Sequence, residues 1–223
     1  MREILPTPVF GSIQQHLRSG ARRGELGWEA GEDDEDVLTG DLGSCLRRGW
    51  SRRVQVNGSA WRWRVTYKKF RGRGRGAAER MLGADGILQV EVEDLRTGMV
   101  DLKGILFQAK KNWRSTNSKL VRQIELMEHI APGGTVVLNY TREVYYAIDG
   151  PIVIRAEGKP ELVAHPMRLG DYLADTFLPC SSGLRGLYYD SRRRILIIPR
   201  PSPPPVISRF ALSHRITVEV EAS

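Results

Sequence analysis

The sequence has few of the residues that build disulfide frameworks, zinc sites or thiol enzymes. Its 223 residues include two cysteines, Cys45 and Cys180, too few for the disulfide framework of a small secreted protein. The four histidines are scattered and, even together with the cysteines, show no spacing typical of zinc ligands. Cys180 has no identifiable base near it in the sequence to activate its thiol. We therefore expect a reduced protein without structural zinc or a nucleophilic cysteine.

Long apolar runs are also missing. No uninterrupted run approaches the roughly 20 apolar residues that a membrane-spanning helix needs, and the first twenty residues contain no apolar segment typical of a secretory signal. We expect a cytoplasmic protein with no membrane partner. With 223 residues and 41% hydrophobic content, the chain can bury one α/β core with extensions.

Charge is plentiful but unevenly distributed. The formal net charge is +8, yet residues 61–75 hold seven Lys or Arg and no acid, whereas residues 29–36 hold six acids. A basic segment attracts polyanions, and carboxylates bind cations. The sequence therefore separates a candidate nucleic-acid-binding region from a candidate metal-binding region.

The basic region combines a predicted strand and a loop. Residues 52–70 have the alternation and aromatic content typical of strands, and the Arg-Gly repeat at residues 71–76 must be a loop. This loop lacks the Gly-Lys-Ser/Thr end of a phosphate-binding P-loop. It is either a solvated loop or a contact to the DNA backbone. The predicted nucleic-acid contacts are Lys68, Lys69, Arg71, Arg73, Arg75 and Lys111.

Hydrophobic periodicity predicts a compact α/β core between residues 29 and 150. Two apolar runs separated by the polar tract at residues 91–103 indicate an antiparallel hairpin. The expected order of helix, three strands, helix and strand is typical of a compact α/β core. The predicted elements are a helix at residues 34–48, strands at 52–70, 83–90 and 104–113, a helix at 115–130 and a strand at 135–140.

The regions flanking this core are less regular. Residues 1–28 are expected to be weakly ordered or peripheral, because Gly11, Gly20, Gly24 and Gly27 would interrupt any helix. Residues 151–223 are expected to form a β-rich extension that packs on the core or on a partner. Within it we predict a short helix at residues 169–177, strands at 194–198 and 215–220, and a stiff polyproline stretch at 201–205. The few residues after that stretch cannot fold alone and should pair onto a sheet or onto a partner.

The predicted hairpin gathers the candidate catalytic side chains. Asp85 comes at the start of its first strand, and Gln108 and Lys110 lie two residues apart near the end of the second, so they project to the same face. Taken alone, Gly-Ala-Asp-Gly is a common turn and Gln-Ala-Lys-Lys is a solvated strand end. Together they bring a carboxylate, an amide oxygen and an ammonium to one edge, where they can hold Mg²⁺ and stabilise charge on a phosphate.

This order of residues resembles the PD-(D/E)xK nuclease superfamily in its Gln-x-Lys variant. Asp85 is followed, after a gap of 22 residues, by Gln108-Ala109-Lys110 at the end of an apolar strand. The acidic start of the helix, at residues 32–39, resembles the first core helix of Mrr-like and related restriction or defence nucleases. The resemblance covers roughly residues 29–140. It implies a restriction-endonuclease-like α/β core, a mixed central sheet flanked by helices, with the C-terminal β-rich extension outside the resemblance.

The resemblance also implies an activity, a cofactor and residue roles. The chain would be a Mg²⁺- or Mn²⁺-dependent DNA endonuclease, the effector of a prokaryotic defence or restriction system. Asp85 would be the central metal ligand, Gln108 an uncharged carbonyl ligand, and Lys110 would orient the attacking water or offset transition-state charge. An extra carboxylate is expected from Glu35, with Glu32 and Glu79 as rivals, although acids at a helix start also simply complement the helix dipole.

Two other functions stay open. The chain could be a nuclease of DNA repair, or a non-catalytic nucleic-acid-binding or assembly subunit that keeps the fold. Because 223 residues leave little room for a separate DNA-reading domain, recognition of DNA would come from a homodimer or from a protein partner of a defence complex.

Overall fold

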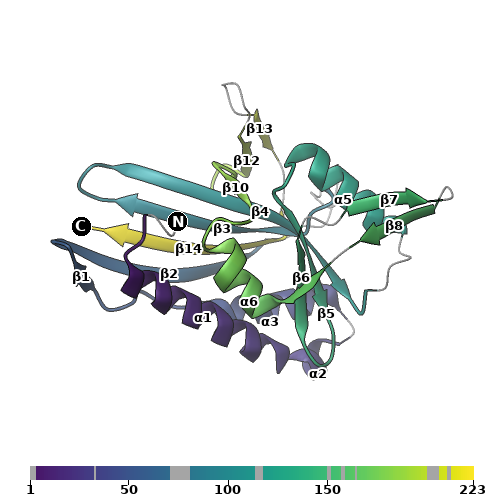
Figure 1. Ribbon diagram of the computed structural model, residues 1–223, viewed down its shortest axis with the longest axis horizontal. Helices are drawn as coiled ribbons and strands as arrows, with labels where there is room; N and C mark the ends of the chain where they lie inside the picture. Colours follow the sequence, from purple (N-terminus) through teal and green to yellow (C-terminus); the bar gives the residue numbers. More distant parts are fainter. Residues whose placement is uncertain are drawn as a thin grey trace.

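The computed structural model describes most of the chain. The described residues are 4–32, 34–70, 81–113, 118–149, 152–156, 159–163, 165–199, 206–209 and 212–223. Within them the protein is a mixed α/β structure, in which a large mixed sheet packs with helices (Figure 1). The predicted polyproline stretch lies outside the described residues.

A nine-stranded mixed sheet forms the centre of the molecule. Its strand order is β1-β2-β14-β3-β4-β5-β6-β9, and β10 pairs with β4 beside this path. β14 runs parallel to β3, and β4 runs parallel to β5, whereas the other neighbouring strands are antiparallel. The strands are β1 (Val54–Val56), β2 (Ser59–Lys69), β3 (Gly86–Asp94), β4 (Met99–Lys111), β5 (Thr135–Tyr140), β6 (Tyr145–Asp149), β9 (Pro166–Arg168), β10 (Leu184–Arg185) and β14 (His214–Ala222).

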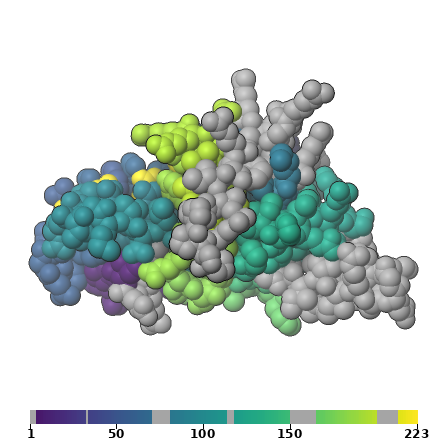
Figure 2. All heavy atoms as spheres, turned by 90° about the horizontal axis from the view of Figure 1, so that it is seen from above, coloured from purple at the N-terminus to yellow at the C-terminus, as the bar shows by residue number. Residues whose placement is uncertain are grey.

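Two smaller sheets stand beside the central one. β11 (Tyr188–Asp190), β12 (Ile195–Ile198) and β13 (Val206–Arg209) form a three-stranded sheet, and β7 (Ile152–Ala156) pairs with β8 (Lys159–Val163). Seen from above, the residues around β10 to β12 lie between the projecting β3–β4 hairpin and α5 (Figure 2). The strand β12 confirms the strand that was predicted at residues 194–198.

The helices cover the sheet in two places. α1 and α3 pack against one another on one side of the sheet (Figure 1), and α5 packs against β4 and β5. None of the helices among the described residues is both long and apolar enough to cross a lipid bilayer. The helices are α1 (Thr7–Glu25), α2 (Trp28–Gly31), α3 (Glu35–Leu46), α5 (Ser118–Ile130), α6 (Leu169–Asp171) and the π-helix η1 (Tyr172–Phe177).

The prediction that glycines interrupt any helix in residues 1–28 is wrong. α1 is a continuous helix of 19 residues that buries Ile13 and Leu17 in the main core. A Cβ atom added at Gly20 would lie 2.8 Å from a methyl of Leu46, and one at Gly24 would lie 3.1 Å from a methyl of Leu42. These glycines therefore allow α1 and α3 to approach closely, and the packing offsets the cost of about 1 kcal/mol per helical glycine.

The polar tract at residues 91–103 was predicted to separate the two strands of the hairpin, but most of it belongs to the strands themselves. β3 continues to Asp94 and β4 begins at Met99, so residues 95–98 alone form the connection. Gly98 has a φ of +68°, which suits a tight turn. The tract is polar because alternate side chains of this hairpin arm, such as Glu91 and Glu93, are partly exposed rather than because the chain leaves the sheet.

The last strand lies inside the sheet rather than at its edge. β14 pairs antiparallel with β2, from His214 opposite Lys69 to Ala222 opposite Trp61, and parallel with β3 on its other side. The expected pairing of the C-terminal residues onto an existing sheet is confirmed. The domain boundary at residue 150 stays a prediction, but β14 belongs to the same sheet as the predicted core.

Candidate active site

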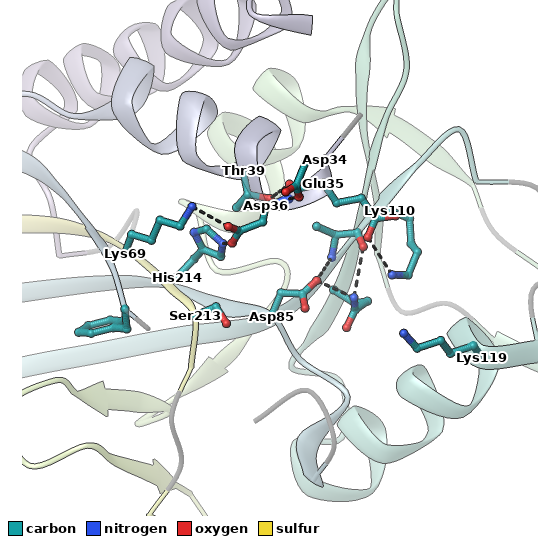
Figure 3. A pocket seen from close by; sticks show the side chains of 13 residues that line it. Asp34, Glu35, Asp36, Thr39, Lys69, Asp85, Lys110, Lys119, Ser213 and His214 are labelled. Carbon is teal, nitrogen blue, oxygen red and sulfur yellow. Dashed lines mark hydrogen bonds and ion pairs between the residues drawn. The ribbon is translucent and has the colours of Figure 1, made fainter. Parts of the chain in front are cut away.

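A cavity of about 800 Å³ opens where α3 faces the ends of β2, β3, β4 and β14. Its walls include Asp85, Gln108, Lys110 and Glu35, the residues that the sequence pattern singles out as catalytic or metal-binding. Asp85 directly precedes β3, Lys110 lies near the end of β4, and Glu35 comes from the first turn of α3 (Figure 3). The structure therefore brings together side chains that are far apart in the sequence.

Asp85 is held by the strand next to it. Its backbone N–H donates to the carbonyl of Phe107 at 2.9 Å, and its Oδ2 accepts hydrogen bonds from Gln108 Nε2 at 2.5 Å and Ala109 N at 2.9 Å. The carboxylate is thus fixed against β4 on the face that lines the cavity.

The glycines on either side of Asp85 have a specific structural role. Gly83 has a φ of +71°, and a Cβ atom added there would lie 2.1 Å from the carbonyl oxygen of Gln123 in α5. A Cβ atom at Gly86 would lie 2.6 Å from the carbonyl oxygen of His214 in β14. The Gly-Ala-Asp-Gly segment is therefore more than a common turn, because its glycines let the backbone near Asp85 lie close to α5 and β14.

Gln108 has a buried oxygen that the protein itself does not satisfy. The residue is 1% exposed, and its Oε1 has no hydrogen-bond partner among the described residues, whereas its Nε2 contacts Asp85. A buried, unsatisfied carbonyl costs about 1–3 kcal/mol. A hard cation would supply the missing interaction, because carboxylate and amide oxygens are the ligands that Mg²⁺ and Mn²⁺ accept. Asp85 and Gln108 therefore fit a divalent metal ion.

The donor set is nevertheless poor in charge. No group of three or more His, Cys, Asp or Glu side chains in the described part of the chain is placed to hold a metal ion. The pattern predicted from the sequence contains an amide in place of one carboxylate, so it does not produce such a group. Water, a backbone carbonyl or an acid at the start of α3 would complete the coordination of a metal ion there.

Glu35 joins α3 to the end of β4. Its Oε2 accepts a hydrogen bond from Lys110 Nζ at 3.1 Å, and its Oε1 accepts one from the backbone N–H of Lys111 at 3.1 Å. Lys110 is 8% exposed, so the ammonium is largely removed from solvent. The direct partner of Glu35 is therefore Lys110, and its role as a metal ligand stays a prediction.

Of the two rivals of Glu35, the structure describes only Glu32. The exposed residue Glu32 is not among the residues that line the cavity, and its backbone carbonyl accepts a hydrogen bond from Lys111 Nζ. Glu79 lies outside the described residues. Of the two acids that the structure describes, Glu35 is the one beside Lys110.

Of the predicted nucleic-acid contacts that the structure describes, Lys69 lines the cavity, whereas Lys68 and Lys111 do not. Lys69 lines it and forms an ion pair with Asp36 Oδ2 at 2.6 Å. Lys68 is exposed, and its ammonium lies 5.1 Å from the centre of the Phe70 ring. Arg71, Arg73 and Arg75 lie outside the described residues.

His214 and Asp36 are cavity residues that the sequence pattern does not reveal. His214 is 1% exposed, its Nε2 lies 2.7 Å from Asp36 Oδ1, and its Nδ1 lies 3.0 Å from the Tyr67 hydroxyl. Burial lowers the pKa of His214. Burial alone would raise the pKa of Asp36, but the hydrogen bonds from Lys69 and His214 outweigh it, so that pKa is lowered.

The sequence carries one indirect signal for this second group. Residues 215–220 have the pattern of a strand that joins a sheet, but nothing in the sequence says which strands it joins. Tyr67 is similarly hidden in the alternation of β2, and burial raises its pKa to about 12.

No family model, curated protein or solved structure matches this chain.

Proposed function

We propose that the protein is a metal-dependent nuclease with a restriction-endonuclease-like core that hydrolyses phosphodiester bonds of DNA. The observation that supports this proposal most is the pairing of Asp85 with Gln108, whose Oε1 is buried without a partner, beside Lys110 in one cavity. A buried carbonyl oxygen without a protein partner can be satisfied by a bound cation or by water. The Asp85 carboxylate, which contacts the amide of the same glutamine, favours the cation.

Asp85 and Gln108 would hold Mg²⁺ or Mn²⁺, with Glu35 as the further carboxylate on the facing helix. When bound, the metal ion would polarise a nonbridging phosphate oxygen and favour ionisation of the attacking water. The acids in the first turn of α3, Glu35 and Asp36, are paired with Lys110 and Lys69.

Lys110 would act on the reacting phosphate. In hydrolysis the water oxygen forms a new bond to phosphorus while one ester P–O bond breaks, and negative charge builds up on the phosphate oxygens. The Lys110 ammonium is held by Glu35 at 3.1 Å and lines the cavity with Asp85. From there it would orient the water or offset the developing charge.

The charge of the whole chain favours a polyanionic substrate. The formal net charge is +8, which attracts the phosphate backbone of a nucleic acid. Within the cavity, Lys69, Lys110 and Lys119 lie beside acidic side chains, so the lysines there would make local contacts to phosphate. The likeness of residues 32–39 to the first helix of restriction and defence nucleases favours DNA as the substrate and a defence system as the setting, with a homodimer or a protein partner for recognition. Repair of DNA would use the same chemistry.

The test is cleavage of supercoiled plasmid DNA. Purified protein should convert the plasmid to nicked or linear forms with Mg²⁺ or Mn²⁺ and should leave it intact when the metal is chelated. Asp85→Ala, which removes the charged ligand, should lose both cleavage and Mn²⁺ binding. Cleavage that persists in the chelator, or in a folded Asp85→Ala protein, would exclude this site as the nuclease centre.

One observation favours the non-catalytic alternative. Gln108 is neutral where a carboxylate would bind metal more tightly, and both oxygens of Glu35 are already engaged by the end of β4. A protein that binds DNA but neither binds Mn²⁺ nor cleaves plasmid would be a nucleic-acid-binding or assembly subunit.

A further inference from the structure

The first turn of α3 is attached to the sheet by two consecutive residues. Glu35 contacts Lys110 and the backbone of Lys111 at the end of β4, and Asp36 contacts His214 of β14 and Lys69 of β2. In Figure 3 Asp36 lies between Lys69 and His214, and Glu35 lies on the side of Lys110. The turn that carries the candidate carboxylate is therefore held from both sides.

The attachment through His214 is the buried one. A carboxylate only accepts hydrogen bonds, so the ring donates from Nε2 to Asp36 at 2.7 Å. In the neutral ring Nδ1 then accepts from the Tyr67 hydroxyl at 3.0 Å. Lys69 and Asp36, in contrast, have side chains that are 47% and 40% exposed. Exposed ion pairs contribute little, so the histidine provides most of the fixed geometry.

The ring of His214 has little freedom to move. It stacks on Tyr67 with ring centres 6.0 Å apart and an angle of 13°, and the ring of Phe107 lies 6.5 Å away. Tyr67 is itself confined, because a Cβ atom added at Gly43 of α3 would lie 2.3 Å from its ring. His214 is thus locked between β2, β4 and the start of α3.

The same residue also contacts the candidate metal ligand. The carbonyl oxygen of Asp85 accepts hydrogen bonds from the backbone N–H groups of Ser213 at 2.9 Å and His214 at 3.1 Å. The backbone of His214 therefore contacts Asp85 while its side chain contacts Asp36. One residue connects the two walls of the cavity that carry Asp85 and Glu35.

We propose that His214 is a positioning residue of the candidate metal site, which acts through Asp36 to hold Glu35 in reach of the metal and of Lys110. This inference rests on the proposed nuclease function. His214 has both ring nitrogens engaged by the protein, so it does not act on the substrate itself. Substitution of residues that orient metal ligands typically reduces metal affinity by about 10–100-fold.

The helix should survive loss of the side chain. One turn beyond Glu35, Thr39 Oγ1 lies 3.1 Å from the hydroxyl of the buried residue Tyr140 in β5. This second anchor, together with the ion pair between Lys69 and Asp36, keeps α3 on the sheet when the contact between His214 and Asp36 is lost. The backbone hydrogen bond from His214 to Asp85 also remains in any side-chain variant, so the substitution isolates the contact to Asp36.

His16 of α1 provides a matched control, because its side chain also contacts α3. It is a partly buried histidine whose Nε2 lies 2.8 Å from the carbonyl oxygen of Leu46 at the opposite end of α3, and its ring packs on Trp63. Loss of either histidine removes one ring and one contact to α3. Only the loss of the His214 ring affects the turn that carries Glu35, because the His16 ring contacts the other end of the helix.

The experiment compares wild type, His214→Ala, His214→Gln and His16→Ala. Mn²⁺ affinity is measured without DNA by electron paramagnetic resonance, the unfolding midpoint by thermal denaturation, and kcat and KM by plasmid cleavage. We expect His214→Ala to weaken Mn²⁺ binding by about tenfold or more and to lower kcat with little change in KM. His214→Gln, whose amide can still donate to Asp36, should recover part of the loss. His16→Ala should lower the unfolding midpoint and leave Mn²⁺ affinity unchanged.

The outcomes separate this inference from the function on which it rests. A wild-type protein that neither binds Mn²⁺ nor cleaves DNA would overturn both. If wild type binds and cleaves while folded His214→Ala keeps its Mn²⁺ affinity, the positioning role alone is wrong. Equal losses of affinity in His214→Ala and His16→Ala would also overturn it, since they would reflect general loosening of α3. If His214→Ala does not fold, His214→Asn is measured instead, because its side chain cannot reach Asp36 as histidine does. Wild-type Mn²⁺ affinity in His214→Asn would overturn the positioning role.

Discussion

At the scale of single residues, the clearest feature is that Lys110 is a nearly buried cation whose acidic partner is Glu35. It is 8% exposed and contacts Glu35 at 3.1 Å. A buried ammonium needs such a partner, because its removal from water is costly. The same isolation strengthens its attraction to any phosphate that enters the cavity. Its position therefore suits chemistry more than general attraction of DNA.

The first prediction concerns this lysine. Lys110→Ala should leave DNA binding nearly unchanged, because one cation among many phosphate contacts contributes little, while cleavage falls by about 10²-fold or more. The measurements are plasmid cleavage and DNA binding at fixed salt. Arg185→Ala is the control for charge, since Arg185 is 66% exposed and pairs with Asp101 on β4 away from the cavity. Wild-type cleavage by a folded Lys110→Ala protein would contradict the assigned site.

The residues of the site differ in how far the sequence could predict them. Asp85, Gln108 and Lys110 are connected by one hairpin, so their spacing and strand context already place them at a common edge. Glu35 needs the additional assumption that the acidic helix packs over that edge. His214 could not be predicted, because its place depends on which strands β14 joins, and this choice is made by packing across the whole sheet.

At the scale of elements, α1 shows how helix propensity and packing compete. Gly11, Gly20 and Gly24 all lower intrinsic helix propensity, yet the helix forms because its apolar face is buried. The sequence shows the glycines but not the helix that packs on them. The same limit explains the hairpin, since polar residues at 91–103 indicate solvent exposure but do not distinguish a loop from the exposed face of a strand.

The second prediction compares two glycines of this helix. A Cβ atom at Gly11 would meet nothing within 4 Å, whereas one at Gly20 would lie 2.8 Å from Leu46 Cδ2 and 3.2 Å from the carbonyl oxygen of Cys45. Gly11→Ala should therefore stabilise the protein by about 0.4–1 kcal/mol. Gly20→Ala should be less stable than Gly11→Ala by about 1 kcal/mol or more, because α1 and α3 must separate.

Chemical denaturation of the two variants measures this difference. The helix content should stay unchanged in both, as circular dichroism would show. Equal stabilisation by the two substitutions would mean that α1 and α3 are not in close contact at Gly20.

At the scale of the whole molecule, the central sheet unites segments from both ends of the sequence. β14 fills the space between β2 and β3 and contributes the buried residues Ile216, Val218 and Val220 to the core shared with α1 and α3. The predicted extension at residues 151–223 is therefore joined to the predicted core through this strand. Periodicity could identify the strand, but its neighbours follow only from the complete fold.

The third prediction tests this integration by hydrogen exchange. Backbone amides of β14 should be among the slowest to exchange, because the strand is paired on both sides and opens only with global unfolding. Amides of β1 should exchange much faster, because β1 is a short edge strand with mostly exposed side chains. Mass spectrometry of peptic fragments distinguishes them. Rapid exchange in β14 would indicate that the strand detaches independently of the sheet.

The position of β14 has a consequence for how the protein folds. Its partners on β2 are distant in sequence, as in the pairing of Ala222 with Trp61, so this contact closes a very long loop and forms slowly. Until it forms, the inner edges of β2 and β3 lack a partner and can associate with other chains. The cavity is also incomplete until then, since Ser213 and His214 form part of its wall. Partly folded chains would therefore be prone to aggregation and would lack the assembled cavity.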